Sequence, residues 1–482
     1  MLDTAADDIT ILNAWPDCAP STLDAADLPD LRAKLRQLSE LPPGDPSYAR
    51  LLGLLDRQIH DRLLRLRPSL RRAALPLSRE ARSRSVEMSD ALGQLAECHL
   101  RALRLLPALD VARDGLLAVY RRFEVCVLAG ATVPPKLWLR ASEMHRVLTR
   151  CAAGNAKVPG PARDGRLIYT RLLALGCVSP EHLSAQEIGD TIDWLEAAEI
   201  PVVLHDDRPR EADESWFWVE LKHDRGPQQF ARRLPPSRPG VMVFSLAPLA
   251  SHALANATQL APLPEEADSG DGEAASLAAL LRRIADQFSG SHKRKLNRRS
   301  SSYRVKVCTG LPDICRLIDP TCAEPPELSD WMVINESAGG FAIMHVSGFI
   351  EGIVSGGVIA LRADADESWT ICLVRWSRSD NPEHVELGLQ ILSNGAQAVD
   401  IAFRHGASNP VRTVKHALLL PALPALRPKF AILAPAGSYT ARRFVLVAQT
   451  SHVYITQGRL ISLDLRTATV ELFQFDLDPY PI

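Results

Sequence analysis

The sequence lacks the features that would place it at once in several common functional classes. Its 482 residues carry a formal net charge of −2, so no overall excess of basic residues draws the chain to nucleic acid or to an anionic membrane. No phosphate-binding GxxxxGK[ST], zinc-protease HExxH or hydrolase GxSxG motif is present. We therefore expect neither catalytic residues nor a nucleic-acid partner.

Secretory signals and long apolar runs are also missing. The first ten residues, MLDTAADDIT, are acidic and contain no apolar signal core. The longest stretch without charged side chains, residues 240–264, is interrupted by Pro248, His252, Asn256 and Gln259. This stretch predicts a loop and a buried helix rather than a membrane span.

The nine cysteines form no C-x-x-C pair. An odd number of cysteines in a long chain without a signal predicts free thiols in a reducing cytoplasm. Cys308, Cys315 and Cys322 recur every seven residues, a wider spacing than the paired cysteines of zinc sites. We expect small buried side chains here, and no metal site.

What the sequence does contain indicates an α+β protein of several domains. Apolar residues make up 46% and charged residues 23%, which is typical of a globular chain. From about Leu28 to Ile200 apolar residues recur at helical spacings of three and four, and Pro68 is expected to end one such run. Ser184 and Glu187 form the pattern of a helix-capping box.

The pattern changes after residue 200. The segments PVVLH and WFWVELK are typical of strands, and the acidic PEEADSGDGE predicts a linker before the helix AASLAALLRRIADQF. Short apolar segments then follow, with the spacing of a small antiparallel barrel. The predicted units are a mainly helical domain at 1–200, a mixed strand and loop extension at 201–263, a linker and helix at 264–290, a barrel at 291–406 and a second small β unit at 407–482.

Two segments of this barrel stand out. HKRKLNRRSSSYRVK, residues 292–306, contains seven Lys or Arg and no acid, and leads directly into the first predicted strand. A run of this kind is usually a solvated linker, although it could also form a nucleic-acid patch. NESAGG, residues 335–340, separates the apolar runs WMVI and FAIMHV, and has more turn residues than a simple turn requires.

These segments resemble the signatures of the PilZ family, whose six-stranded β-barrel binds cyclic di-GMP. RKLNR places Arg294 and Arg298 at the spacing of the family's R-x-x-x-R motif. NESAGG matches [D/N]-x-S-x-x-G at Asn335, Ser337 and Gly340. In ELGLQIL, Gly388 occupies the glycine position of the family's closing strand, and the resemblance covers about residues 291–403.

The resemblance departs from the family at one point. Several residues separate Arg298 from the predicted strand VKV, whereas the arginine motif usually lies close to the first strand. Arg299 and Arg304 are rival candidates, but they are five residues apart instead of four. We favour Arg294 and Arg298, with Arg299 as an additional ligand-binding residue.

The chemistry of the ligand agrees with these residue types. Cyclic di-GMP carries two phosphodiester charges and two guanines, and arginine makes bidentate contacts to phosphate and to the guanine O6/N7 edge. Lysine offers only a point charge. Asn335 and Ser337 provide short donors and acceptors, and Gly340 allows a close backbone approach. No cofactor is expected beside this ligand.

The resemblance therefore implies a cyclic di-GMP receptor that passes nucleotide binding to a protein partner through its helical region. One alternative is a degenerate PilZ adaptor that no longer binds nucleotide, and another is a nucleic-acid binder that uses the basic run. The complete set of Asn335, Ser337 and Gly340 favours the receptor over the adaptor. The near-neutral charge disfavours the nucleic-acid binder.

Overall fold

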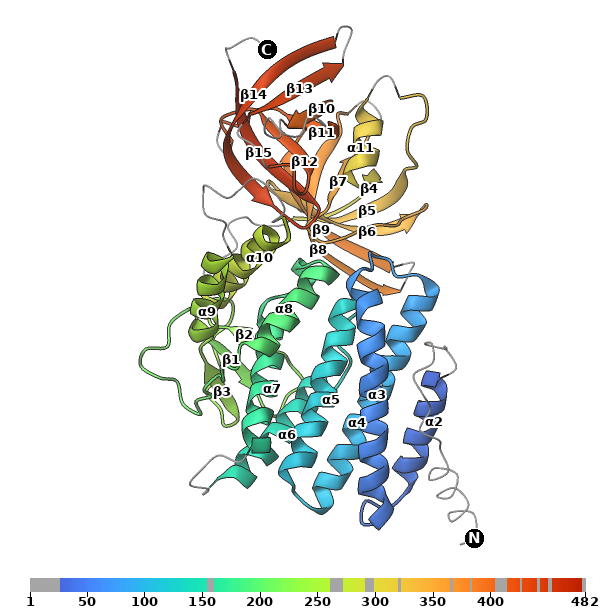
Figure 1. Cartoon of the computed structure of the whole chain (residues 1–482), viewed down its shortest axis with the longest axis vertical. Helices are drawn as coiled ribbons and strands as arrows, with labels where there is room; N and C mark the ends of the chain where they lie inside the picture. Colours follow the sequence, from blue (N-terminus) through green and yellow to red (C-terminus); the bar gives the residue numbers. More distant parts are fainter. Residues whose placement is uncertain are drawn as a thin grey trace, which may run out of the picture.

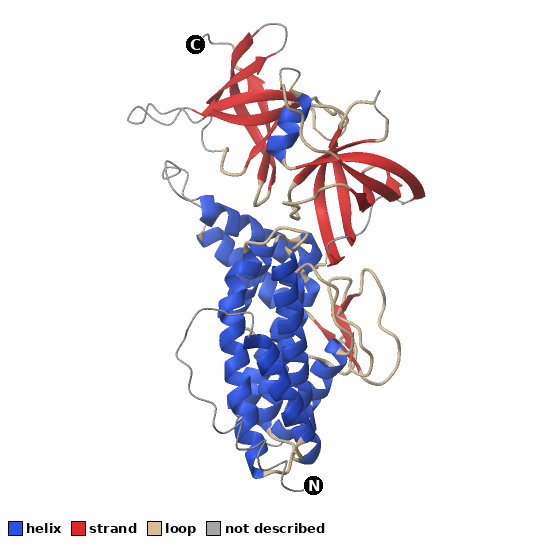
Figure 2. Ribbon diagram, turned by 90° about the vertical axis from the view of Figure 1, so that its right-hand side faces the viewer, coloured by secondary structure: helices blue, strands red, loops and turns tan. Residues whose placement is uncertain are grey.

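The computed structural model describes most of the chain and places helices at one end and two β-barrels at the other (Figure 1). The predicted α+β architecture is confirmed. Figure 2 shows the helices as an elongated bundle, with a small sheet on its side. The described residues are 27–153, 160–260, 272–290, 299–319, 322–364, 367–381, 384–403, 414–424, 427–439, 443–449 and 453–478.

The helical region is a bundle of long amphipathic helices that pack side by side. Its elements are α2 (Asp27–Glu40), α3 (Pro46–Arg71), α4 (Arg79–Leu105), α5 (Leu109–Leu128), α6 (Leu137–Ala152), α7 (Gly160–Cys177), the short η1 (Pro180–His182) and α8 (Ala185–Ala197). The capping box before α8 is present, because the Ser184 hydroxyl accepts from Glu187 N while the Glu187 carboxylate accepts from Ser184 N.

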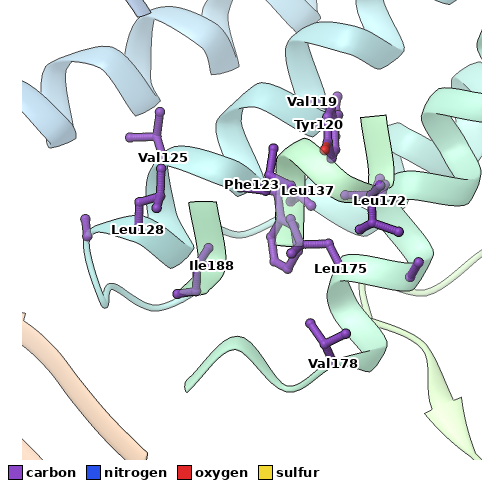
Figure 3. Close-up of a cluster of buried hydrophobic side chains, with 14 of the residues drawn as sticks. Val119, Tyr120, Phe123, Val125, Leu128, Leu137, Leu172, Leu175, Val178 and Ile188 are labelled. Carbon is purple, nitrogen blue, oxygen red and sulfur yellow. The ribbon is translucent and has the colours of Figure 1, made fainter. Parts of the chain in front are cut away.

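The core of the bundle is a continuous set of apolar side chains (Figure 3). Val119, Tyr120 and Phe123 of α5 lie among side chains of α6, α7 and α8. Glycines allow close helix packing, and a Cβ on Gly165 would lie 2.5 Å from Leu148 Cδ1. The bundle is therefore held by shape-matched apolar contacts.

The expectation that Pro68 ends its helix is wrong. Helix α3 continues for one further turn to Arg71, with Pro68 inside it. Leu66 and Leu70 are both buried on the core-facing side, so apolar packing of the last turn outweighs the one backbone hydrogen bond that proline removes.

A buried ion network joins three helices of the bundle. The Glu124 side chain on α5 is 0% exposed and pairs with Arg67 of α3 and with Arg121, whose Nη1 lies 2.8 Å from Glu124 Oε2. Both arginines also contact Glu196 of α8. Because each buried charge has an opposite partner, the network fixes the relative positions of α3, α5 and α8.

A small extension packs on the side of the bundle. It contains β1 (Phe217–Glu220), β2 (Gln228–Gln229) and β3 (Val241–Phe244) in the order β2-β1-β3, followed by α9 (Ala247–Gln259) and α10 (Gly272–Phe288). The predicted strand PVVLH is not a strand, and only its His205 bridges to Val243. Stretch 240–264, predicted to be a loop and a helix, contains the strand β3 before the helix α9. No described helix is both long and apolar enough to cross a bilayer.

The first barrel is closed and antiparallel, with the strand order β4-β5-β6-β9-β8-β7. Its interior is filled by Trp331, Val333, Ile343 and Val374, which are almost completely buried. The elements are β4 (Arg299–Thr309), α11 (Leu311–Ile318), β5 (Ser329–Ser337), β6 (Gly340–Ser347), β7 (Val358–Arg362), β8 (Thr370–Asn381) and β9 (His384–Ser393).

The second barrel repeats this connectivity. Its strand order is β10-β11-β12-β15-β14-β13, so in both barrels three sequential strands are followed by the sixth, fifth and fourth. The elements are β10 (Gln397–Phe403), β11 (Val414–Leu420), β12 (Ala431–Pro435), β13 (Arg443–Gln449), β14 (Val453–Arg466) and β15 (Val470–Leu477). The C-terminal region thus has the topology of the first barrel.

One predicted boundary needs correction. The sequence places VDIAF, residues 399–403, in the first barrel, but β10 pairs with β11 and β13 of the second. The first barrel is already closed by β4 pairing with β7, so it has no edge that could accept β10. The break between the barrels therefore lies between Ser393 and Gln397, and not at residue 406.

The two barrels share an apolar interface built around α11. Leu311 and Ile314 of this helix belong to one buried cluster with Leu373 of β8 and with Leu418 and Leu433 of the second barrel. Figure 1 shows α11 beside strands of both barrels. An interface of buried apolar side chains predicts that the barrels move as one body.

One contact between the helical region and the barrels is made by the β6–β7 loop, residues 348–357. Leu75 and Ile353 form an antiparallel bridge with N···O distances of 2.8 and 3.0 Å. Ser355 Oγ donates to the Glu181 carbonyl at 2.9 Å. In the same loop the Gly356 carbonyl accepts from Thr467 Oγ1 of the second barrel at 2.8 Å. The β6–β7 loop thus joins all three units.

Eight of the cysteines lie among the described residues, and none of these eight forms a disulfide; Cys18 lies outside them. Cys308 is in β4 and Cys315 in α11, both buried. Within the described ranges no group of three His, Cys, Asp or Glu side chains is arranged to hold a metal ion.

Candidate functional site

The NESAGG segment forms the tight connection between β5 and β6. Ser337 and Gly340 are Cα partners, so Ala338 and Gly339 alone make the loop. Ser337 Oγ donates to the Gly340 carbonyl at 3.3 Å, and the Gly339 carbonyl accepts from Ile391 N of β9 at 3.0 Å. The turn is therefore held in one position by its own side chain and by the neighbouring strand.

The two glycines of the resemblance are required by the sheet itself. A Cβ on Gly340 would lie 1.9 Å from the Leu389 carbonyl oxygen, so β6 and β9 approach too closely for any other residue. A Cβ on Gly388 would lie 1.7 Å from Trp376 Nε1, because the indole covers this position. We predicted that Gly340 admits a ligand, and the structure adds strand packing as a second reason for glycine.

Asn335 has an unused acceptor. Its Oδ1 is buried and has no hydrogen-bond partner among the described residues. A buried acceptor without a partner costs free energy, about 1–3 kcal/mol, and this cost is removed when a water or a ligand donates to it. Asn335 lies near the end of β5, two residues before Ser337 at the turn.

The first strand of the barrel begins opposite this turn. Arg299 and Ser300 of β4 are the Cα partners of Glu336 and Asn335. Arg294 and Arg298 lie outside the described residues.

The expected gap between the arginine motif and the first strand is therefore absent. Strand β4 starts at Arg299 and not at VKV, so R-x-x-x-R immediately precedes it. Both Arg299 and Arg304 are exposed, but Arg304 pairs with Met332, farther from the turn than the Arg299 position opposite Glu336. Position along β4 favours Arg299 over Arg304 as an additional contact.

Sequence reasoning missed two polar residues beside the turn. The Tyr303 hydroxyl donates to Glu336 Oε2 at 3.0 Å. Burial, and then this bond to Glu336, raise the pKa of Tyr303 to about 12. The hydroxyl stays protonated and holds the carboxylate inside the NESAGG segment. The alternation of β4 and β5 could not have revealed this pair, because a bulge between Ser300 and Tyr303 shifts the register.

A closed six-stranded antiparallel barrel with N-x-S-x-x-G at its β5–β6 turn is a PilZ domain. Residues 11–207 match the family model described as cyclic-di-GMP receptor FimW, N-terminal domain. Residues 320–398 match the model described as cyclic-di-GMP receptor FimW, middle PilZ domain. Together the two matches span more than half of the chain, which therefore belongs to this family of cyclic-di-GMP receptors. No curated protein matches the chain.

The two matched ranges cover different parts of the molecule. The first contains α2 to α8, so the helical bundle, for which the sequence suggested no named role, is part of the receptor family. The second contains the NESAGG turn and Gly388 but neither the arginine segment nor β4. Most of the second barrel also lies outside both ranges.

Proposed function

We propose that this chain binds cyclic di-GMP between the arginine segment and the β5–β6 turn, with Arg294, Arg298 and Arg299 on one side and Asn335, Ser337 and Gly340 on the other. The observation that carries the proposal is the buried Asn335 Oδ1 without a partner, at the register position where β4 begins. The receptor family of the chain supports the choice of ligand.

The chemistry of the two sides is complementary to the ligand. Guanine offers N–H donors that an amide oxygen can accept, and the Asn335 oxygen is free to do so among the described residues. The arginines supply bidentate donors for a phosphodiester or for the guanine O6/N7 edge. Receptor binding of this kind requires no catalytic residue and no further cofactor.

The expected affinity follows from the number of charged contacts. Each charge-assisted hydrogen bond contributes about 1.5–3 kcal/mol, and several together reach about −8 kcal/mol, or micromolar binding. Ordering side chains at the site opposes part of this gain.

Calorimetric titration of the full chain with cyclic di-GMP tests the proposal. Arg298→Ala should weaken binding at least thirtyfold, about 2 kcal/mol, and Arg298→Lys should restore little of it because lysine cannot bind bidentately. Arg316→Ala is the matched control, since Arg316 lies on α11 and pairs with Asp313. If the unmodified chain gives no binding heat, the adaptor without nucleotide replaces the receptor. If lysine equals arginine, charge alone explains the contact.

We further propose that nucleotide binding is passed to a protein partner through the helical region. Strand β6 begins at Gly340 of the turn and leads into the β6–β7 loop, where Ile353 bridges to Leu75 and Ser355 bonds to Glu181. The helix α10 leads from the other side into the arginine segment. The turn is therefore connected to the helical region through the hydrogen bonds of the β6–β7 loop and, along the chain, through α10. The free thiols fit a cytoplasmic receptor.

Amide hydrogen exchange with and without cyclic di-GMP tests this transmission. We expect new protection at residues 293–304 and 335–340, and a smaller change in α10 and at Leu75. Protection that stays confined to the turn would refute the transmission even if the nucleotide binds.

A further inference from the structure

A second polar cavity lies where the three units meet, away from the β5–β6 turn. It has a volume of about 170 Å³. Arginines from all three units line it: Arg283 of α10, Arg375 of β8 and Arg466 of β14. His182 of η1 completes the polar wall. Figure 1 shows α10, β8 and the second barrel converging in this part of the molecule.

Two of the arginines are fixed by carboxylates behind them. Arg283 Nη1 lies 2.7 Å from Glu187 Oε1, and Arg466 Nε lies 2.7 Å from Glu471 Oε1, whose side chain is 2% exposed. Each arginine has further N–H groups beyond the one that faces its carboxylate. The cavity therefore contains guanidinium donors whose positions are set in advance.

Arg375 differs from the other two arginines. Its guanidinium has no hydrogen bond or ion pair with any described residue, although it lines the cavity. Its side chain is accessible to solvent, yet protein atoms surround much of it. Burial, and then the charge of Arg283, lower its pKa from the ordinary value. The pKa of His182 is lowered, mainly by burial; the charge of Glu181 opposes this shift and the charge of Arg375 adds to it.

The lining of the cavity thus has more cations than carboxylates, although Glu187 and Glu471 behind it already pair with Arg283 and Arg466. Asp286, which is exposed, is the one carboxylate among the described residues that line it. Like charges brought together at partly buried positions repel one another, and an anion between them removes the repulsion. Arginine also matches the geometry of phosphate oxygens with paired N–H donors.

We propose that this cavity binds a phosphate-class oxyanion that bridges Arg283, Arg375 and Arg466. Its volume is below the range of about 300–1,000 Å³ that holds drug-sized ligands, so the occupant is a phosphoryl-sized group and not a whole dinucleotide. Free phosphate and the terminal phosphate of a mononucleotide share this chemistry.

An anion at this position would fix α10 against both barrels. Since α10 ends at Phe288, shortly before the arginine segment in sequence, the bound anion would fix the helix end from which this segment starts. By linkage, an anion that changes the affinity for cyclic di-GMP has its own affinity changed by the same factor. The cavity would then act as a second input to the receptor.

Titration of the full chain with inorganic phosphate, followed by ³¹P line broadening and by calorimetry at constant ionic strength, tests the site. We expect saturable binding that Arg375→Ala weakens at least tenfold. Arg378→Ala is the matched control, because it removes the same charge from the same strand outside the cavity. Guanosine monophosphate in place of phosphate distinguishes the two sources, since tighter binding of the mononucleotide assigns the anion to a nucleotide.

The control variants separate this site from the PilZ site. Asn335→Ala should leave phosphate binding unchanged, so failure of one proposal does not decide the other. Circular dichroism checks that the Arg375→Ala variant is folded. Equal losses in Arg375→Ala and Arg378→Ala, or no effect of phosphate beyond that of chloride at the same ionic strength, would overturn the proposal.

Discussion

Removal of the Asn335 side-chain amide should change stability and ligand binding in opposite directions. The Asn335 Oδ1 atom is buried without a partner among the described residues. In the free protein an unsatisfied buried acceptor costs about 1–3 kcal/mol. Asn335→Ala removes this cost and should leave the free protein as stable as before, or more stable. The same change removes the acceptor that the ligand would use, and should weaken cyclic di-GMP binding by about 1.4–3 kcal/mol, ten- to 150-fold.

Ser337 provides the matched control in the same turn. Its Oγ donates to the Gly340 carbonyl, so Ser337→Ala loses a bond that the free protein already makes. That loss should destabilise the free protein by about 0.5–1.5 kcal/mol. The two alanine variants are thus expected to differ in the sign of their effect on stability, although both remove one small polar group from one turn.

Scanning calorimetry and binding titration together measure both effects. Unfolding entropy is about 2.1 cal/mol/K per residue, so for 482 residues 1 kcal/mol shifts the melting temperature by only about 1 °C if all units unfold together. The shift is larger if the first barrel unfolds as its own unit. If Asn335→Ala lowers the melting temperature as much as Ser337→Ala, or binds cyclic di-GMP as well as the unmodified chain, the oxygen is not a reserved ligand acceptor.

Two further predictions concern the helical bundle. Glu124→Gln should destabilise the chain by about 3 kcal/mol, measured by chemical denaturation, because the carboxylate is 0% exposed between Arg67 and Arg121; the exposed Glu80→Gln should change stability by less than about 0.5 kcal/mol. Burial, and then Arg166, lower the pKa of His145 to about 4, so its contribution to stability is present above about pH 6.5 and is lost as the pH falls toward 4. His145→Phe should flatten that part of the pH–stability profile, and an unchanged slope would contradict the assignment.

The sequence predicted those features correctly that depend on local residue patterns. The apolar spacing of α3 and the box at Ser184 and Glu187 predicted helices that the structure contains. The NESAGG segment predicted a turn between two barrel strands. These features depend on local periodicity and on turn chemistry, which residue types express directly.

Features that depend on pairing partners could not be predicted in this way. β10 alternates like a strand of either barrel, and only closure of the first barrel assigns it to the second. The eight-residue α11 is too short to show a helical repeat, yet it supplies the interface between the barrels. The bridge between Leu75 and Ile353 uses backbone atoms alone, which leave no signature in residue type.

The residue at which β4 starts determines how far the arginine motif lies from the first strand along the chain. RSSSYR is polar and exposed, so a search for apolar alternation began the strand only at Val305. The paired backbone of Arg299 and Ser300 opposite Glu336 and Asn335 extends it to the arginine motif. A strand that projects beyond the barrel core has no apolar face to bury, and hydrophobic periodicity therefore underestimates its length.

The equal connectivity of the two barrels raises the question of why a ligand turn is proposed for the first barrel alone. In the second barrel the place of the NESAGG turn is taken by the β11–β12 connection, residues 421–430. There Arg427 is 5% exposed, and its Nη2 donates to the Pro421 carbonyl at 3.0 Å and to the Leu392 carbonyl at 3.3 Å. Its guanidinium thus attaches the β11–β12 connection to the end of β9. The corresponding turn of the first barrel has instead the Asn335 Oδ1 acceptor, which has no partner among the described residues. In the second barrel the β11–β12 connection is therefore part of the junction with the first barrel. A second contact joins them, because Thr467 in the β14–β15 turn donates to Gly356 of the β6–β7 loop. Fixed in this way, the second barrel supports the loop that connects the PilZ domain to the helical region, and a nucleotide is expected at the first barrel alone.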